Sequence, residues 1–223
     1  HQNTTGFGSK ENPPMVAIYT GHHTDQKLQD QRIAYSLDNG RTWTKYQGNP
    51  VIDEGMKDFR DPKVLWHKES QQWIMVVALS AENKIRFYGS ENLKEWQMLS
   101  DFGPTGASGD ILWECPDLFE LPVDGSENES KWVLQVDVNP GAPHGGSGGQ
   151  YFVGQFDGQK FVQDPSTNSE TMWADYGKDF YAVQSYANIP ETDGRRIWLA
   201  WMNNWQYAEA IPTSPWRSAM TIP

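Results

Sequence analysis

The feature that most constrains the fold is a unit that recurs along this 223-residue chain. Each copy opens on an acidic or aromatic head, continues as short apolar and alternating runs, and includes a Gly, Asn or Asp turn with an aromatic residue nearby. The copies begin near Arg60, Glu114 and Asp179, so equivalent landmarks lie about 50 to 65 residues apart. Helical periodicity is almost absent. The chain is therefore predicted to be all-β.

Each complete unit contains about four candidate strands, and this number indicates the architecture. The first complete unit has them at 60–66, 73–77, 85–88 and 91–96, and the second at 114–119, 132–136, 151–153 and 156–161. A third unit has strands at 179–182 and 197–201, and a partial unit before the first has them at 15–19, 32–36 and 42–46. This pattern is typical of β-propeller blades. A β-sandwich is the weaker alternative, because it would not need the same landmark at every head.

The charge balance argues against two classes of partner. Asp and Glu number 29 against 18 Lys and Arg, which gives a net charge of −11. A chain with so few cations is not expected to bind nucleic acid or an anionic membrane. No run of 18 apolar residues is present, so no transmembrane helix is expected. The balance suits a protein that acts on neutral substrates, and the 11 tryptophans fit either structural slots or sugar stacking.

No cofactor or metal is predicted. The single cysteine, Cys115, excludes an internal disulfide and a cysteine-based zinc site. His22 and His23 are adjacent, which points their rings apart on a strand or turn, and no third ligand follows at a metal-like spacing. No phosphate-binding loop, Ser-His-Asp order or Cys-His pair is evident.

Carboxylates stand at the heads of the three units, at Asp61, Glu114 and Asp179. The innermost strands of a propeller line one central funnel, so side chains at equivalent positions are expected to converge there. Hydrolysis of a glycosidic bond needs such a set, because one carboxylate attacks or stabilises while another carboxyl protonates the leaving oxygen. For Asp179 alone, a turn-capping role is an open alternative.

Two stretches carry a family resemblance that covers essentially the whole chain. The stretches 59–62 (FRDP) and 113–119 (WECPDLF) resemble the two internal motifs of glycoside hydrolase family 32, which includes invertases, exo-inulinases and levanases. Similar support comes from 19–23 (YTGHH), 177–182 (GKDFYA) and 201–207 (WMNNWQY). The resemblance implies a five-bladed β-propeller and a retaining hydrolysis through a fructosyl-enzyme intermediate.

The same resemblance implies roles for individual residues. Glu114 would be the acid/base, and Asp61 would stabilise the transition state by holding ring hydroxyls of the fructosyl unit. Arg60 would donate to a substrate hydroxyl and help keep Asp61 ionised. Asp179 and Trp205 would bind substrate, with Trp205 stacking on the terminal fructose; the alternative for Trp205 is packing within a blade.

One expected motif is absent from the sequence. The family's nucleophilic aspartate lies in an N-terminal WMNDPNG motif, and the stretch 202–204 (MNN) lacks the acid. Residues 1–223 are therefore expected to be an incomplete propeller, from roughly the last part of blade two through blade five, without the first blade and the C-terminal β-sandwich. Expressed alone, this segment should be unstable and inactive.

The leading functional prediction is a secreted, exo-acting hydrolase that releases fructose from inulin, levan or sucrose. Fructan or sucrose is the only expected partner, and the oligomeric state is left open. One alternative is a propeller that binds carbohydrate without catalysis. Another is a five-bladed glycosidase acting on arabinan or xylan, which the Cys-Pro pair after Glu114 disfavours.

Overall fold

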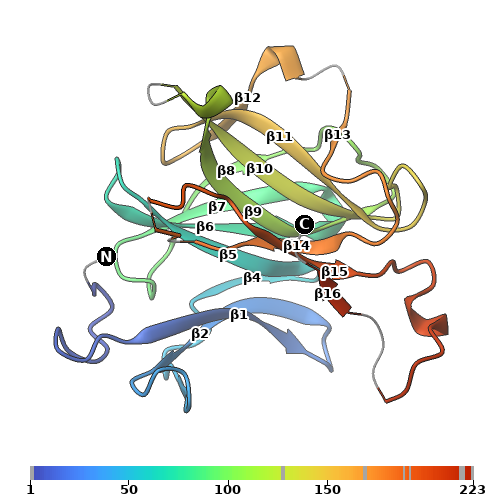
Figure 1. The fold of residues 1–223 in the computed structure, drawn as a ribbon. Coiled ribbons are helices and arrows are strands. Elements are labelled where there is room, and N and C mark those ends of the chain that lie inside the picture. Colours follow the sequence, from blue (N-terminus) through green and yellow to red (C-terminus); the bar gives the residue numbers. More distant parts are fainter. Residues whose placement is uncertain are drawn as a thin grey trace.

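The computed structural model describes residues 3–126, 129–167, 170–187, 189–190, 192–215 and 219–221. These residues form sixteen β-strands and four short 3-10 helices, and no α-helix occurs among them. The strands make four antiparallel sheets that follow one another along the chain, as Figure 1 shows by the succession of colours from blue to red. The all-β prediction is confirmed.

The bounds of the elements are as follows. The first sheet contains β1 (Met15–His23), β2 (Leu28–Ser36), β3 (Thr44–Lys45) and β4 (Ile52–Met56). The second contains β5 (Phe59–His67), β6 (Gln72–Leu79), β7 (Lys84–Ser90) and β8 (Gln97–Phe102). The third contains β9 (Leu112–Pro122), β10 (Ser130–Asn139), β11 (Gly148–Phe156), β12 (Phe161–Gln163) and β13 (Met172–Trp173). The fourth contains β14 (Tyr181–Ser185), β15 (Trp198–Met202) and β16 (Ala219–Thr221). The 3-10 helices are η1 (Ser80–Glu82), η2 (Val123–Gly125), η3 (Pro165–Thr167) and η4 (Ala208–Ala210).

Most predicted strands fall inside observed ones, and the exceptions have local causes. The predictions at 15–19, 32–36, 73–77 and 132–136 lie within β1, β2, β6 and β10. The prediction at 91–96 is wrong, because the Asn92 side chain accepts the N–H groups of Lys94 and Glu95 and folds this stretch into a turn. The prediction at 156–161 is also wrong, because Asp157 Oδ1 accepts the N–H groups of Gln159 and Lys160 and folds the stretch between β11 and β12 into a turn. The strands β4, β8, β13 and β16 were not predicted.

The core lies between the sheets, and β6 illustrates why its sequence is apolar on both faces. Ile74, Val76 and Ala78 pack towards the third sheet in one cluster with Trp113 and Leu134. The alternate residues Met75, Val77 and Leu79 pack in a second cluster with Ile52 and Phe59. Successive strand residues point to opposite faces, so a sheet covered on both sides needs a continuous apolar run.

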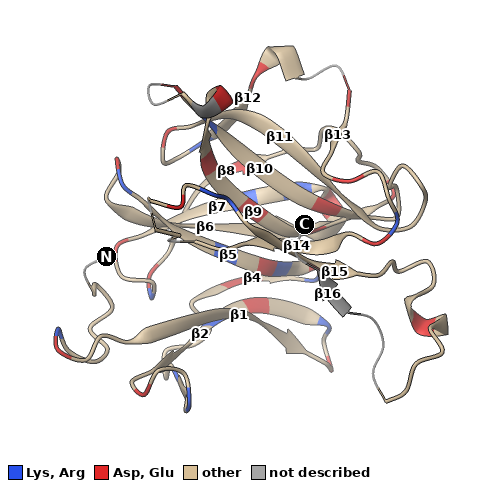
Figure 2. Ribbon diagram, viewed as in Figure 1, with Lys and Arg blue, Asp and Glu red and all other residues tan. Residues whose placement is uncertain are grey.

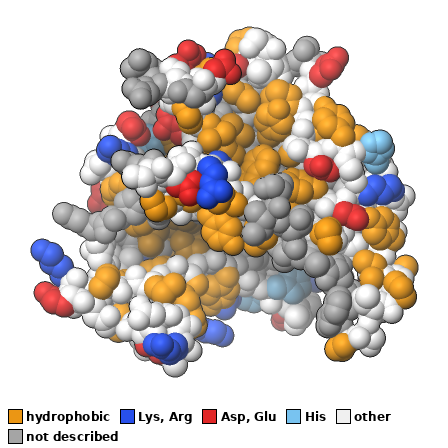
Figure 3. All heavy atoms as spheres, viewed as in Figure 1, with side chains coloured by type: hydrophobic (Ala, Val, Ile, Leu, Met, Phe, Trp, Pro, Cys, Tyr) orange, Lys and Arg blue, Asp and Glu red, His pale blue; other side chains and the backbone are white. Residues whose placement is uncertain are grey.

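The first strands of successive sheets lie side by side. β1 contacts β5, β5 contacts β9, and β9 contacts β14. Figure 3 shows the surface hollowed between the first sheet and the sheets above it, with hydrophobic side chains in the hollow. The arrangement brings residues far apart in sequence onto one row of strands.

The first strands of the second, third and fourth sheets share an irregularity at one place. In β5, β9 and β14, two residues stand opposite one residue of the neighbouring strand, which is a β-bulge. The residue within each bulge has a left-handed φ: 64° at Asp61, 48° at Cys115 and 53° at Ala182. Non-glycine residues rarely adopt this conformation, so its repetition marks structurally equivalent positions.

The positions of the bulges show which residues at the heads of the three units are structurally equivalent. The residues immediately before the left-handed positions are Arg60, Glu114 and Tyr181, and these are equivalent. The prediction that Asp61, Glu114 and Asp179 occupy equivalent positions is therefore wrong. Asp61 is one residue further along its strand than Glu114, and Asp179 precedes β14 altogether. The extra residue of a bulge is set by backbone conformation, which the side-chain pattern does not reveal.

A buried ion pair ties three of these strands together beneath the bulges. Lys63 Nζ on β5 lies 3.5 Å from Asp117 Oδ1 on β9, and the Asp117 side chain is fully buried. Both side chains also reach β14, where Lys63 Nζ donates to the Ser185 carbonyl at 2.7 Å and Asp117 Oδ2 accepts the Ser185 N–H at 2.6 Å. One residue of each sheet thus meets the other two.

The change Lys63→Met in the full-length protein should lower the free energy of unfolding by about 3–5 kcal/mol, because it leaves Asp117 buried without its cation. Denaturant unfolding would measure the loss. The matched control is Lys68→Met at an exposed position, which should change stability by less than about 0.5 kcal/mol. Equal stabilities of the two variants would mean that the ion pair does not hold the sheets together.

Acidic and basic residues are scattered over the sheets and loops in Figure 2. Among the described residues, no helix has the length and apolar character needed to span a membrane.

Candidate active site

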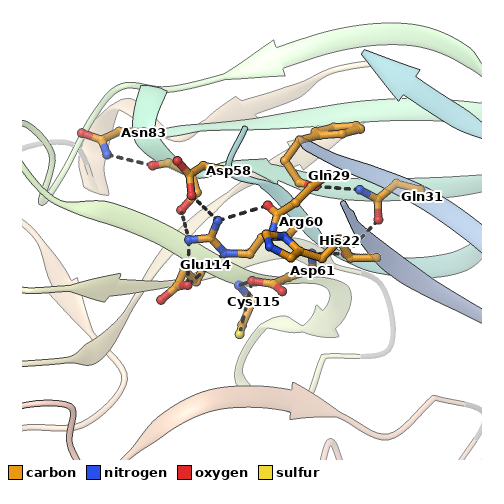
Figure 4. A network of polar contacts seen from close by, with 12 residues as sticks. His22, Gln29, Gln31, Asp58, Arg60, Asp61, Asn83, Glu114 and Cys115 are labelled. Carbon is orange, nitrogen blue, oxygen red and sulfur yellow. Dashed lines mark hydrogen bonds and ion pairs between the residues drawn. The ribbon is translucent and has the colours of Figure 1, made fainter. Parts of the chain in front are cut away.

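The three equivalent residues before the bulges form a hydrogen-bonded line across three sheets. Arg60 Nε and Nη2 on β5 each lie 3.0 Å from Glu114 Oε1 on β9 (Figure 4). The Tyr181 hydroxyl on β14 donates to the other carboxyl oxygen, Oε2. Glu114 is thereby held from both sides, by a cation on one oxygen and a hydroxyl on the other. This line exists because the bulges bring the same position of each strand to the same level.

Asp61 lies next to this line and is fixed through main chain and side chain. Its Oδ2 accepts the Cys115 N–H at 3.0 Å, with the Cys115 thiol 3.7 Å away. Its own N–H donates to Thr20 Oγ1 on β1 at 3.1 Å, and Thr20 in turn donates to Gln31 at 3.0 Å. The structure therefore brings Arg60, Asp61 and Glu114 into one cluster, with the two carboxyls on neighbouring strands.

Arg60 is the cation of the cluster. Besides Glu114, it donates to Asp58 at 2.7 Å, to Ser80 at 3.0 Å and to Gln29 at 3.3 Å. Burial lowers the pKa of Arg60, but the Asp58 hydrogen bond and the Glu114 charge outweigh it, so the net shift is upward. The guanidinium therefore stays charged, and its donors are oriented by four partners.

Burial and neighbouring charges perturb the acids of the cluster. Burial raises the pKa of Asp61, and the Glu114 charge adds to the rise, whereas the Cys115 N–H and Arg60 oppose it. Burial also raises the pKa of Tyr181, as do the charges of Asp137 and Glu114, so its hydroxyl keeps the proton that it donates to Glu114. A buried carboxyl with a raised pKa beside a fixed cation is typical of a catalytic site.

The remaining two predicted site residues lie apart from the cluster. Asp179 is exposed and accepts a hydrogen bond from the Tyr207 hydroxyl, so nothing in this structure joins it to the carboxyl pair. Trp205 is 50% exposed, and its ring centroid lies 5.1 Å from that of Trp201. The Trp201 ring lies 6.4 Å from Tyr181, so an aromatic row leads from Glu114 to the surface.

Sequence reasoning missed several members of the site. Tyr181 lies within the stretch 177–182, but the sequence predicts no role for it, because its equivalence to Glu114 depends on the bulge. Gln29 and Thr20 come from the β1–β2 hairpin, which contacts β5 only in the folded chain. Thr20 lies in the stretch 19–23 but received no role, and no sequence signal marked Gln29. Among the described residues, no group of three or more His, Cys, Asp or Glu side chains has a metal-binding arrangement.

The cluster has two of the parts that cleavage of a glycosidic bond requires, a proton donor and a carboxylate that stabilises charge. Glu114 can give and take a proton between two oriented donors. A carboxylate at Asp61 can stabilise positive charge that develops on a neighbouring sugar ring.

A comparison with family models gives one match over nearly the whole chain. The model described as the N-terminal domain of glycosyl hydrolases family 32 matches residues 3–223.

Curated proteins with high similarity are fructan-degrading enzymes by name. The levanase of Bacillus subtilis is 56% identical over 222 residues, and an extracellular exo-inulinase of Aspergillus niger is 46% identical over 246 residues. Both alignments cover 99% of this chain, but only 32% and 45% of those proteins. The chain thus spans less than half the length of these relatives.

Solved structures agree. The fructofuranosidase of Schwanniomyces occidentalis complexed with fructose has a TM-score of 0.90 and 49% identity, covering 98% of this chain and 42% of that one. A thermostable family-43 glycoside hydrolase, at 12% identity and a TM-score of 0.58, shares the fold alone.

Proposed function

Because the chain belongs to glycoside hydrolase family 32, we propose that it forms part of the catalytic propeller of an enzyme that releases fructose from β-fructans or sucrose. The observation that carries the proposal is the cluster of Arg60, Asp61 and Glu114 on neighbouring strands. Relatives named levanase and exo-inulinase support the substrate class. Relatives named extracellular support a secreted protein.

In the proposed reaction, Glu114 is the acid/base. It protonates the glycosidic oxygen as the bond to the anomeric carbon breaks, and it later takes a proton from the water that releases fructose. Asp61 stabilises the positive charge of the fructosyl ring in both steps. Arg60 orients Glu114 and offers a donor to a substrate hydroxyl. The attacking carboxylate comes from a part of the enzyme other than residues 1–223, since this cluster uses its two carboxyls for the other roles.

We further propose that the four sheets are blades two to five of a five-bladed propeller, with blade two incomplete in this segment. The half-buried character of β1 supports this proposal, because none of its residues is buried although it is the first strand of its sheet. The first strands β5, β9 and β14 each contain buried residues. A further strand beside β1 would pair its free edge and cover these side chains.

The aromatic row from Tyr181 through Trp201 to Trp205 favours a substrate whose chain leaves the site over exposed rings. Flat apolar faces suit stacking on sugars. On this view Trp205 contacts the carbohydrate, whereas Asp179 holds Tyr207 at the rim. Asp179 therefore contributes to substrate binding only through the position of this tyrosine.

The test of the function uses the full-length protein with sucrose, inulin and levan as separate substrates. Fructose should be released from at least one of them, and with an exo enzyme free fructose should appear before any longer oligosaccharide. Chromatography of the early products would measure this. Binding of fructans without any release of fructose would contradict the proposal and favour a carbohydrate-binding role.

The change Tyr181→Phe should lower kcat on sucrose by about tenfold, because Glu114 Oε2 loses its oriented donor while the ring remains. KM should change little, since the hydroxyl faces Glu114. The matched control is Tyr176→Phe, at an exposed tyrosine in the loop that precedes β14. If Tyr181→Phe matches wild type in kcat, the hydroxyl does not assist the acid/base.

A further inference from the structure

One buried carboxyl beside the site has no part in the proposed reaction. Asp137 on β10 is fully buried and stands directly opposite Glu114 in the β9–β10 ladder. Directly opposed residues share one face of the sheet, with Cβ atoms about 4.5–5.5 Å apart. Asp137 is therefore a close neighbour of the acid/base, on the side away from solvent.

Its hydrogen bonds reach across to the fourth sheet. Asp137 Oδ2 accepts the Val183 N–H at 2.9 Å, and Oδ1 contacts Gln135 Nε2 at 2.6 Å. Val183 follows Ala182 in the bulge of β14, two residues after the tyrosine that donates to Glu114. The bulge leaves this N–H outside the β14–β15 ladder, and the Asp137 carboxyl supplies its acceptor.

The surrounding strands are shaped to admit this carboxyl. Gly149 on β11 stands opposite Asp137, and a Cβ at Gly149 would lie only 2.9 Å from Asp137 Oδ1. Glycine at this position is therefore required by the close approach of the side chain. The fit between Gly149 and Asp137 indicates that the carboxyl has a specific role at this position.

The groups around Asp137 oppose its ionisation. No described lysine, arginine or histidine pairs with it, and the acids that face it are Glu114, Asp61, Cys115 and Tyr181. Burial raises the pKa of Asp137 well above its usual range, and the charges of Glu114 and Asp61 add to the rise. Turning the Gln135 amide about its last bond would put Oε1, in place of Nε2, beside Asp137 Oδ1, where it could accept a proton from a neutral Asp137. Gln135 Oε1 is otherwise buried without a partner.

We propose that Asp137 is a positioning residue for the acid/base: its carboxyl anchors the β14 bulge through the Val183 N–H, and the bulge holds the Tyr181 hydroxyl on Glu114. This inference rests on the proposed function for its effect on catalysis. The contact between Asp137 and Val183 can be tested without it.

The discriminating variants are Asp137→Asn and Asp137→Leu in the full-length protein. The asparagine oxygen can still accept the Val183 N–H, and its NH2 group can donate to Gln135 once the Gln135 amide turns to present Oε1, so kcat on sucrose should stay within about threefold of wild type. Leucine has similar size but no acceptor, so kcat on sucrose should fall about tenfold, as in Tyr181→Phe, because the Tyr181 hydroxyl shifts away from Glu114. On p-nitrophenyl β-D-fructofuranoside, whose leaving group needs little protonation, the loss should be several-fold smaller.

Two further variants separate positioning from general loosening. Val183→Ala weakens the packing of β14 but keeps its N–H, so it should lower stability and leave the ratio of the two substrates unchanged. The double variant Asp137→Leu with Tyr181→Phe should be no slower on sucrose than Asp137→Leu alone, because both changes remove one interaction. Additive losses would overturn the proposal, as would an Asp137→Asn variant as slow as Asp137→Leu.

Amide hydrogen exchange at Val183 gives a readout that does not depend on activity. Exchange should be unchanged in Asp137→Asn and at least tenfold faster in Asp137→Leu. If wild type releases no fructose from any substrate, the proposed function fails while this result still decides the contact. If wild type is active and Val183 exchange is the same in all variants, the positioning role fails alone.

Discussion

Glu114→Gln in the full-length protein is expected to lower kcat on sucrose and inulin by about 10³-fold, because general acid catalysis contributes about 10²- to 10⁴-fold. Glutamine keeps the shape of the side chain: its oxygen can still accept from Arg60, and its NH2 group can donate to the Tyr181 hydroxyl oxygen. It cannot deliver a proton to the leaving oxygen. Steady-state kinetics on p-nitrophenyl β-D-fructofuranoside should show a much smaller loss in the step that releases p-nitrophenol, since this leaving group departs as a stable anion.

The matched control for this change is Glu120→Gln, at an exposed position on the same strand β9. Its kcat should equal that of wild type on every substrate. Equal losses by Glu114→Gln on the natural and the activated substrate would remove Glu114 from the acid role and leave only an electrostatic one.

Asp61→Asn should lower kcat by about 10²- to 10³-fold, the usual loss when one preorganised electrostatic contact to a transition state is removed. The asparagine oxygen can still accept the Cys115 N–H, so the bulge should persist. What is lost is the negative charge beside the sugar ring. Because positive charge develops on the ring whatever the leaving group, the loss should be the same on sucrose and on the activated substrate.

The loss of activity thus depends on the leaving group for Glu114→Gln but not for Asp61→Asn, and this difference distinguishes the roles of the two carboxyls. Asp53→Asn, at an exposed position on β4, is the control for loss of a negative charge without loss of a site contact. If Asp61→Asn spared the activated substrate as Glu114→Gln is expected to do, the roles given to the two residues would have to be exchanged.

The parts of the fold that sequence predicts well are those set by local pattern. The alternating and continuous apolar runs gave the strands of the second and third sheets, because burial on one or two faces dictates side-chain type directly. The carboxyls Asp61 and Glu114 were found because they lie at the heads of successive units and within the motifs at 59–62 and 113–119. Their proximity followed from the repeat rather than from any local signal.

The parts that sequence did not predict depend on backbone conformation or on contacts between sheets. A left-handed residue other than glycine leaves no mark in the sequence, so Asp179 was aligned with Glu114 in place of Tyr181. Asp137 looks like an ordinary polar residue within a strand. Only the packing of the third sheet against the fourth makes it a fully buried acid beside the site.

The three bulges have a consequence for how such a protein can change. The left-handed position is occupied by aspartate, cysteine and alanine in turn, and the residue before it by arginine, glutamate and tyrosine. The bulge conformation therefore accepts side chains that differ in size and charge. Substitutions at these positions can therefore alter the chemistry of the site one sheet at a time, while strand pairing outside the bulge is left intact. These six positions are therefore the ones to randomise in a search for variants with new specificities.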